Sequence, residues 1–127
     1  MRICIDTNRY QDFCEGAEDA AAVIRKSSEI NIPFIVVAEL RAGFACGKKG
    51  PENERVLSLF LHKPRVKLLL ADEGTTFIYA HLFRQLRTQR TPIPANDLWI
   101  SALAVQHGLL LFSRNTHFQK LPQIPII

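Results

Sequence analysis

The sequence predicts an α/β domain with a mainly parallel central sheet of four to five strands flanked by helices. Short apolar segments alternate along the chain with longer segments of helical periodicity, a pattern typical of parallel strands joined by helices. The chain has 127 residues, 47% of them hydrophobic and 22% charged, which suits one compact core. We therefore expect residues 1 to 127 to form a single domain.

The first part of the chain contains two predicted strands, each followed by a helix. Residues 2 to 5 are apolar and predict a buried strand. A helix is expected over residues 17 to 28, because its early acids and late basic residues match the helix dipole, and Asn31 is expected to end it. Residues 32 to 37 then predict a second strand and residues 38 to 45 a helix.

A basic turn at residues 47 to 51 precedes another amphipathic segment. The apolar residues of this segment recur at helical spacing and are expected in the core or an interface; they are Val56, Leu57, Phe60 and Leu61. Residues 66 to 70 predict a third strand, and residues 72 to 90 a long helix with a basic C-terminal half. One face of that helix is expected to be formed by Phe77, Ile78, His81, Leu82 and Leu86.

The last third of the chain repeats the alternation once more. Asp97 is expected to open a helix that ends at His107 and Gly108, where glycine favours a C-terminal stop. Residues 109 to 112 predict a fourth strand, and residues 124 to 127 a short edge strand.

Cysteine and histidine usage gives no zinc or disulfide signature. The odd set of Cys4, Cys14 and Cys46 lacks paired CxxC spacing and predicts reduced thiols in or near the core of a cytoplasmic protein. The histidines lack an HExxH pattern, so we expect helix-end or surface positions for His62, His81, His107 and His117.

The charge of the chain indicates the kind of partner it binds, and its hydropathy bears on membrane insertion. The formal net charge of +4 moderately favours a polyanionic partner such as nucleic acid. No apolar run approaches the roughly 20 residues that cross a bilayer. Asp6 interrupts the first apolar segment, unlike a signal peptide, so we expect neither membrane insertion nor secretion.

Three acids stand where apolar segments give way to polar or helical sequence: Asp6, Glu39 and Asp97. Ligands of open parallel sheets bind at the carboxyl ends of the strands, so these acids are expected to converge. Converged carboxylates favour a hard divalent cation, Mg²⁺ or Mn²⁺ rather than Zn²⁺. This predicts a metal-dependent phosphoryl-transfer site, although each acid taken singly would more often be a helix-capping or first-turn residue.

Four segments carry a family resemblance: Ile-Asp-Thr-Asn at 5 to 8, Val-Ala-Glu-Leu-Arg-Ala-Gly at 37 to 43, Pro-Ala-Asn-Asp-Leu-Trp-Ile-Ser-Ala at 94 to 102, and Ser-Arg-Asn-Thr-His-Phe at 113 to 118. In order and spacing they resemble the motifs of PIN domains, and most of all the VapC-type ribonuclease toxins of toxin-antitoxin pairs. The resemblance covers essentially the whole chain. It implies a PIN-like three-layer fold, Mg²⁺- or Mn²⁺-dependent RNA cleavage, and usually a homodimer.

Carried over residue by residue, the resemblance assigns metal-binding roles to Asp6, Asp97 and Glu39, the last directly or through a water that it orients or deprotonates. Ser113 matches a hydroxyl that hydrogen-bonds the catalytic carboxylate, and Thr7 could cap a helix or donate to the site. Where many relatives have Thr-Arg-Asp, this chain has Ser-Arg-Asn. Asn115 therefore offers the metal only a neutral oxygen, which favours one resident metal over two.

Other expectations concern the nucleic acid and the partners. Candidates for phosphate contacts are Arg41, Arg90 and Arg114. We expect an RNA substrate, for which tRNA is one candidate. The resemblance also implies a small cognate antitoxin that fills the acidic cleft.

Two other classes of protein remain open. A catalytically weak or silent PIN-like module that binds RNA or protein is favoured only by Asn115. A phosphatase of the haloacid dehalogenase type also begins with a strand-end aspartate, but it requires a second aspartate at position 8, where this chain has Asn8.

Overall fold

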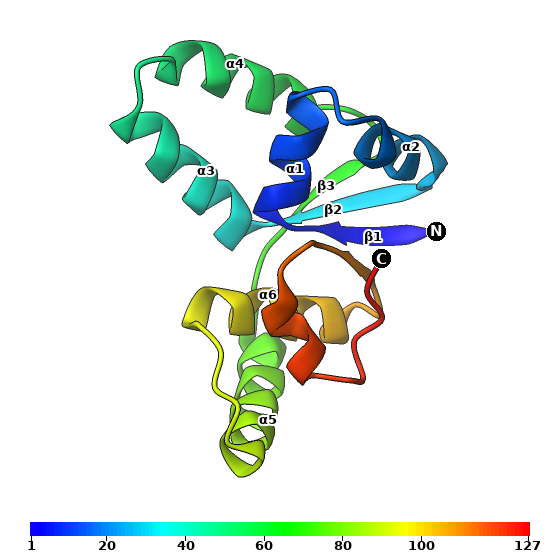
Figure 1. The fold of residues 1–127 in the computed structure, drawn as a ribbon, viewed down its shortest axis with the longest axis vertical. Helices are drawn as coiled ribbons and strands as arrows, with labels where there is room; N and C mark the ends of the chain where they lie inside the picture. Colours follow the sequence, from blue (N-terminus) through cyan, green and yellow to red (C-terminus); the bar gives the residue numbers. More distant parts are fainter.

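A four-stranded parallel sheet of order β3-β2-β1-β4 forms the centre of the computed structural model, which describes residues 1 to 127 (Figure 1). The strands are β1 (Arg2–Ile5), β2 (Glu29–Pro33), β3 (Val66–Leu69) and β4 (Leu110–Phe112). The helices are α1 (Thr7–Cys14), α2 (Glu18–Lys26), α3 (Phe34–Cys46), α4 (Gly50–Leu61), α5 (Glu73–Gln89), α6 (Ala95–Gln106) and the short 3₁₀ helix η1 (Thr116–Lys120).

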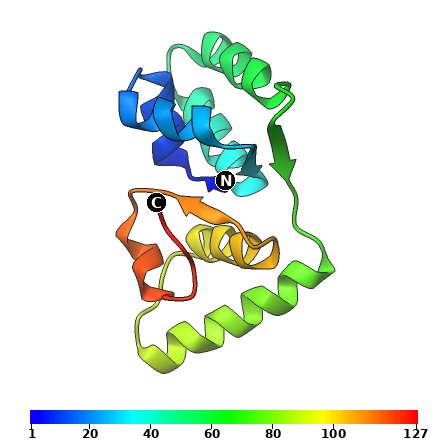
Figure 2. The same ribbon diagram turned by 90° about the vertical axis from the view of Figure 1, so that its right-hand side faces the viewer.

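The helices form a layer on each side of the sheet. Figures 1 and 2 show α1 to α4 on one side, and α5, α6 and η1 on the other. Helix α6 lies between the sheet and α5, which explains why it is apolar around most of its surface: Ile100, Ala102 and Leu103 are fully buried. The predicted three-layer α/β architecture is confirmed.

Strand order creates a switch point beside β1. The chain passes from β1 to β2 and β3 on one side, and later returns to place β4 on the other side of β1. In open parallel sheets the crevice at such a reversal, beyond the carboxyl ends of the strands, is the usual ligand site. The residues that follow β1 and β4 therefore lie where a ligand of this sheet is expected.

The second strand begins and ends earlier than the sequence predicted. Residues 34 to 37 belong to α3, and Asn31 lies within β2 with 4% of its surface exposed, while α2 already ends at Lys26. Pro33, at φ −61° and ψ 144°, occupies the N-cap position of α3. A short apolar run can be a buried strand or a buried helix, and its periodicity alone does not distinguish them.

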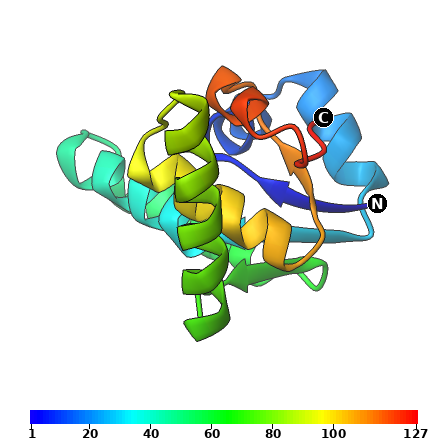
Figure 3. The ribbon, with the colours of Figure 1, turned by 90° about the horizontal axis from the view of Figure 1, so that it is seen from below.

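Several side-chain positions also differ from expectation. On α5, Leu82 and Leu86 are buried, but Phe77 is 70% exposed and His81 is exposed, because the helix packs against α6 along a narrower stripe than its apolar residues occupy. Figure 3 shows the outer face of α5 uncovered by any other element. Of the cysteines, Cys4 is buried as expected, whereas Cys14 and Cys46 are exposed.

The C-terminal tail adds one parallel bridge to the sheet in place of the predicted edge strand. Ile126 pairs with Leu111, whose backbone N–H donates to Pro125 and whose carbonyl accepts from Ile127, both at 2.9 Å. None of the helices combines the length and the apolar character needed to cross a membrane.

Glu29 joins three strands at the end of the sheet where they begin. Its carboxylate accepts hydrogen bonds from Lys67 of β3, from Asn31 at 3.1 Å and from Arg2 of β1 at 2.8 Å. The Asn31 amide also donates to the Ile3 carbonyl at 3.2 Å. These donors, with Lys67 the largest contributor, lower the pKa of Glu29 to about 2.

We expect Glu29→Gln to reduce the free energy of unfolding at neutral pH. Because the pKa of Glu29 is depressed in the folded state, its contribution is complete above its ordinary value of 4.5 and is lost as the pH falls towards 2. Urea denaturation at several pH values should show wild type and variant converging in acid. Glu18→Gln, which removes only an exposed pair with Arg25, is the matched control. A gap between wild type and Glu29→Gln that persists at the acid end would contradict this role.

Candidate active site

Asp6 stands at the carboxyl end of the central strand. It follows β1, has 4% of its surface exposed, and its extended backbone places it at the N-cap of α1. Its Oδ1 accepts a hydrogen bond from the Thr7 backbone N–H at 2.8 Å, and its own N–H donates to the Phe112 carbonyl of β4 at 3.0 Å. The same residue thus caps a helix and marks the switch point between two strands.

Ser113, the first residue after β4, completes the environment of Asp6. Its Oγ donates to Asp6 Oδ2 at 2.6 Å and accepts from the Asn115 N–H at 3.0 Å. Asn8 adds a weaker contact, from Nδ2 to Asp6 Oδ2 at 3.3 Å, while its Oδ1 accepts from the Arg114 N–H at 3.2 Å. The segment after β4 is therefore fastened to the segment after β1 through the carboxylate.

Glu39 is half-buried in α3, the helix that follows β2 on the other side of β1 from β4. The Thr7 hydroxyl donates to Glu39 Oε1 at 3.1 Å, so Thr7 links this acid to the residue directly after Asp6. Helix α3 starts where β2 ends, which brings its second turn to the carboxyl end of the sheet.

Asp97 lies in the first turn of α6 and is 8% exposed. Its Oδ2 accepts from the Asn115 amide at 3.1 Å and contacts His117 Nδ1 at 2.7 Å. The other end of the Asn115 amide, Oδ1, accepts from the His117 N–H at 3.0 Å and caps η1. Both side chains that hold Asp97 thus come from the turn after Ser113.

The acids act on one another electrostatically. Burial is the largest cause that raises the pKa of Asp6; hydrogen bonds from Ser113 and Thr7 lower it, and the charge of Asp97 raises it further. Burial likewise raises the pKa of Glu39, with the Thr7 hydrogen bond opposing it and the charges of Asp6 and Asp97 adding to it. A cation placed among them would relieve this repulsion.

The arrangement suits a loosely bound hard cation better than a closed metal cage. No set of three or more His, Cys, Asp or Glu side chains is disposed as a ready-made metal centre. Mg²⁺, however, usually keeps several waters and takes only one or two carboxylates together with phosphate oxygens. The oxygen donors Asp6 and Asp97, whose charges act on each other, fit that mode. The Asn115 oxygen already accepts from His117, so its role as a ligand stays a prediction.

The three predicted phosphate-binding arginines have different surroundings. Arg41 pairs with Glu54 of α4 at 2.8 Å, and Arg114 pairs with Asp12 of α1 at 2.7 Å. Both guanidinium groups are therefore already engaged by carboxylates. Arg90, at the C-cap of α5, makes no ion pair.

His117 is the functional candidate that sequence reasoning missed. It was expected at a helix end or on the surface, yet its ring holds Asp97. A detectable signal existed, because His117 belongs to the same segment as Ser113 and Asn115. Its contact with an acid sixteen residues before that segment depends on how η1 turns back onto α6, which no local pattern specifies.

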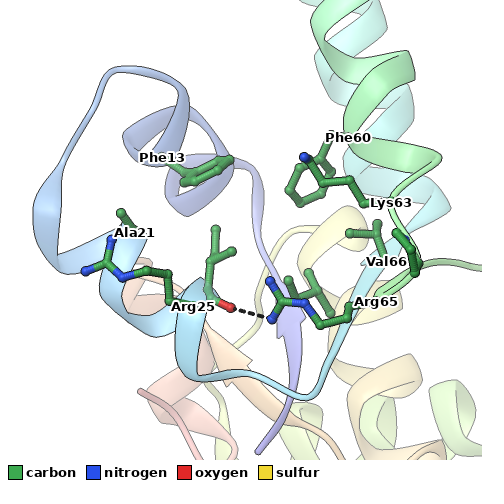
Figure 4. Close-up of a pocket in the computed structure, with 10 residues that line it drawn as sticks. Phe13, Ala21, Arg25, Phe60, Lys63, Arg65 and Val66 are labelled. Atoms are coloured by element: carbon green, nitrogen blue, oxygen red, sulfur yellow. Dashed lines mark hydrogen bonds between the residues drawn. The ribbon is translucent and has the colours of Figure 1, made fainter.

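A separate cavity of about 340 Å³ lies at the opposite end of the sheet (Figure 4). Phe13, Phe60 and Val66 contribute apolar walls, and Arg65 donates to the carbonyls of Ile24, at 3.0 Å, and Ser27. None of the predicted site residues lines it. The acids therefore do not belong to this cavity.

One protein family matches nearly the whole chain. The family model described as PIN domain matches residues 3–124. The chain belongs to the PIN-domain family. Relatives include Ribonuclease VapC4 of Mycobacterium tuberculosis, 31% identical over 78% of this chain and 76% of that protein, and Ribonuclease VapC2 of Rickettsia felis, 30% identical over 80% and 75%.

Solved structures of PIN-domain proteins share the whole architecture. The chain matches VapBC2 from Rickettsia felis, bound to a DNA fragment from its promoter, with TM-score 0.87 and 25% identity over 100% of this chain and 98% of that one. It matches FitAcB from Neisseria gonorrhoeae with TM-score 0.77 and 27% identity over 98% and 96%. The family resemblance drawn from the four motifs is thereby confirmed.

We expect Ser113→Ala to raise the pKa of Asp6 in this PIN domain. The Ser113 hydroxyl is the first of the hydrogen bonds that lower this pKa, so its removal leaves burial and the charge of Asp97 less opposed. Carbon-13 NMR titration of the Asp6 carboxyl would measure the shift. Ser101→Ala is the control, because buried Ser101 bonds only the backbone carbonyl of Asp97, at 2.8 Å. An unchanged Asp6 titration in Ser113→Ala would contradict the assignment.

Proposed function

We propose that this PIN-domain chain is a metal-dependent endoribonuclease, a VapC-like toxin that hydrolyses RNA phosphodiester bonds. The observation that carries the proposal is the buried Asp6 carboxylate at the switch point: the charge of Asp97 raises the pKa of Asp6, and the charge of Asp6 raises the pKa of Glu39. The relatives named Ribonuclease VapC support the same activity. Apart from Asn115, no residue of the site favours a silent binding module.

The chemistry expected here is in-line attack of water on a phosphodiester. A bound Mg²⁺ or Mn²⁺ supplies a more acidic water and offsets charge on the phosphate oxygens. Asp6 and Asp97 are the residues that would hold it, since both are buried carboxylates whose orientation is fixed by hydrogen bonds.

The other residues position these groups or move a proton. Glu39, whose pKa is raised, is suited to orient the attacking water and accept its proton. Ser113 and Thr7 fix the Asp6 and Glu39 carboxylates, and Asn115 and His117 fix Asp97. An Asn at 115 leaves three carboxylates in the site, which favours one resident metal.

The proposal extends to partners. We infer that this chain acts in the cytoplasm on an RNA such as tRNA, forms a homodimer, and is inhibited by a small cognate antitoxin that covers the acidic site. The solved VapBC-1 structure from nontypeable Haemophilus influenzae, matched with TM-score 0.85 and 25% identity, supports an antitoxin partner.

Asp6→Asn should abolish RNA cleavage and weaken Mn²⁺ binding, because it removes the charge of the principal metal ligand. Glu39→Gln should lower the cleavage rate by roughly 10²- to 10⁴-fold, the range of general base catalysis, with a smaller loss of metal affinity. Cleavage of a structured RNA pool that includes tRNAs, with Mg²⁺, Mn²⁺ or EDTA, and calorimetric Mn²⁺ titration would measure both effects.

Asp12→Asn is the matched control, because Asp12 is an α1 carboxylate paired with Arg114 and Arg9 and not with the site. Cleavage that survives EDTA or Asp6→Asn would contradict the metal mechanism. Retained RNA binding without Mn²⁺ binding or cleavage would instead identify a silent module.

An antitoxin encoded beside this chain should inhibit cleavage when the two proteins are coexpressed. The expected result is a stable complex with little nuclease activity that regains activity after the smaller protein is digested away. Affinity copurification followed by the same cleavage assay would test it. An adjacent gene that encodes no small binding protein would contradict the toxin-antitoxin assignment, while leaving the nuclease assignment intact.

A further inference from the structure

Helix α5 carries a row of cations without acidic partners. After Glu73 the helix contains no further acid, while Arg84, Arg87 and the C-cap residue Arg90 follow one another at intervals of three, which places them on neighbouring parts of one surface. The ion pairs of the chain involve other residues. All three arginines are exposed, so this row is free to meet an anion.

Two of these arginines flank an apolar pocket of about 220 Å³. The buried residues Leu86 of α5 and Leu98 of α6 line it together with Phe83, which is 50% exposed. Pro92 and Ile93, from the segment between the two helices, complete it with Arg87 and Arg90. No acid lines the pocket. The apolar walls and the aromatic ring of this pocket suit a flat uncharged group, and the arginines at its rim suit an anion attached to that group.

Arg90 occupies a backbone conformation that favours glycine. Its φ of 59° and ψ of 35° are left-handed, and the turn is closed by the Thr91 N–H donating to the Leu86 carbonyl at 3.0 Å. Glycine adopts this helix-terminating geometry without the steric penalty of a Cβ atom. Arg90 thus occupies a backbone conformation that glycine would adopt without this penalty, and its guanidinium is the group that glycine would lack.

The pocket is connected to the acids by a short path. Residues 91 to 94 lead directly from Arg90 to α6, and Leu98 in the pocket is the next residue after Asp97. Figures 1 and 2 show this segment running from the end of α5 back to the start of α6. The pocket and Asp97 therefore lie at the same end of α6.

We propose that this pocket binds one unpaired base of the RNA substrate, stacked on Phe83, while Arg87 and Arg90 contact the flanking phosphates. The inference rests on the proposed nuclease function and names a specificity site for it. Single-stranded RNA is read in this way in general: splayed bases stack on aromatic rings, and arginines neutralise the backbone. The absence of acids and the unpaired arginines favour an anionic occupant over a cationic or purely apolar one, and the exposed Phe83 ring favours one that carries flat bases.

The test uses the full chain with Asp6→Asn, so that the RNA is not consumed, and a short fluorescein-labelled single-stranded RNA. Phe83→Ala should weaken binding by roughly 5-fold or more, the lower end of base stacking at about 1 kcal/mol. Phe83→Trp should retain binding. An RNA with one abasic residue at the bound position should bind the parent more weakly but lose little further affinity with Phe83→Ala. Phe77→Ala is the matched control, since Phe77 is a more exposed ring on the same helix outside the pocket.

The arginines are tested by salt dependence. Arg87→Ala and Arg90→Gly should each reduce the slope of log affinity against log salt by roughly 0.7, the value for one single-strand phosphate contact. Arg90→Gly should also keep or raise the Tm, because it relieves the left-handed backbone, so weaker binding cannot be attributed to unfolding.

Three results would overturn this assignment. Unchanged affinity in Phe83→Ala and Arg90→Gly, with cleavage intact in the same variants made without Asp6→Asn, would remove the pocket but not the nuclease. A lower molecular mass of Phe83→Ala in light scattering would assign the pocket to a contact between two copies. An Asp6→Asn parent that does not bind RNA, together with a wild-type chain that does not cleave it, would remove both proposals.

Discussion

The hydrogen-bonded burial of the Asp6 carboxylate is the constraint on which the site depends. An isolated carboxylate in a protein interior is strongly unfavourable unless polar groups compensate it. Here the compensation comes from the backbone of α1 and from Ser113 after β4, so the charge can be accommodated only when both segments are in place. One side chain thereby couples the end of the central strand, the start of a helix and the far side of the switch point. The charge of Asp97 acts on this fixed group, and its own charge acts on Glu39.

Asn115 departs from the family pattern, but its amide makes hydrogen bonds that fit this site. An aspartate at this position would bring a fourth negative charge beside Asp97, and its carboxylate could not donate a hydrogen bond to it. The amide does donate, at 3.1 Å, while its oxygen caps η1 and so positions His117 against the same carboxylate. The segment from Ser113 to His117 therefore serves both Asp6 and Asp97. Its sequence is compatible with a site that holds fewer negative charges than a four-acid centre.

Some arginines of this chain are held in ion pairs or hydrogen bonds within the fold, whereas those near the end of α5 have no acidic partner. Arg9 and Arg41 pair with carboxylates of neighbouring helices, and Arg114, which follows β4, pairs with Asp12 of α1. Arg65 caps the end of α2. The net charge of +4 does not show where on the surface the unpaired positive charge lies. The three arginines of α5 are exposed, and only the short segment between α5 and α6 separates them in sequence from the first turn that holds Asp97. Such a separation allows an anionic chain to be attracted by one surface and cut at another.

The sequence by itself determined the fold class, the family and the acids that recur after apolar segments, because strand alternation, helix dipoles and ordered motifs are local properties of the chain. It misplaced β2, since a buried helix start and a buried strand have similar short apolar sequences, and it left Phe77, Cys14 and Cys46 in the wrong environment. Only the tertiary structure decided that His117 meets Asp97, that Arg41 and Arg114 are already paired, and that Arg90 borders an apolar pocket. Those contacts join residues far apart in sequence, and their geometry depends on how whole helices pack against the sheet.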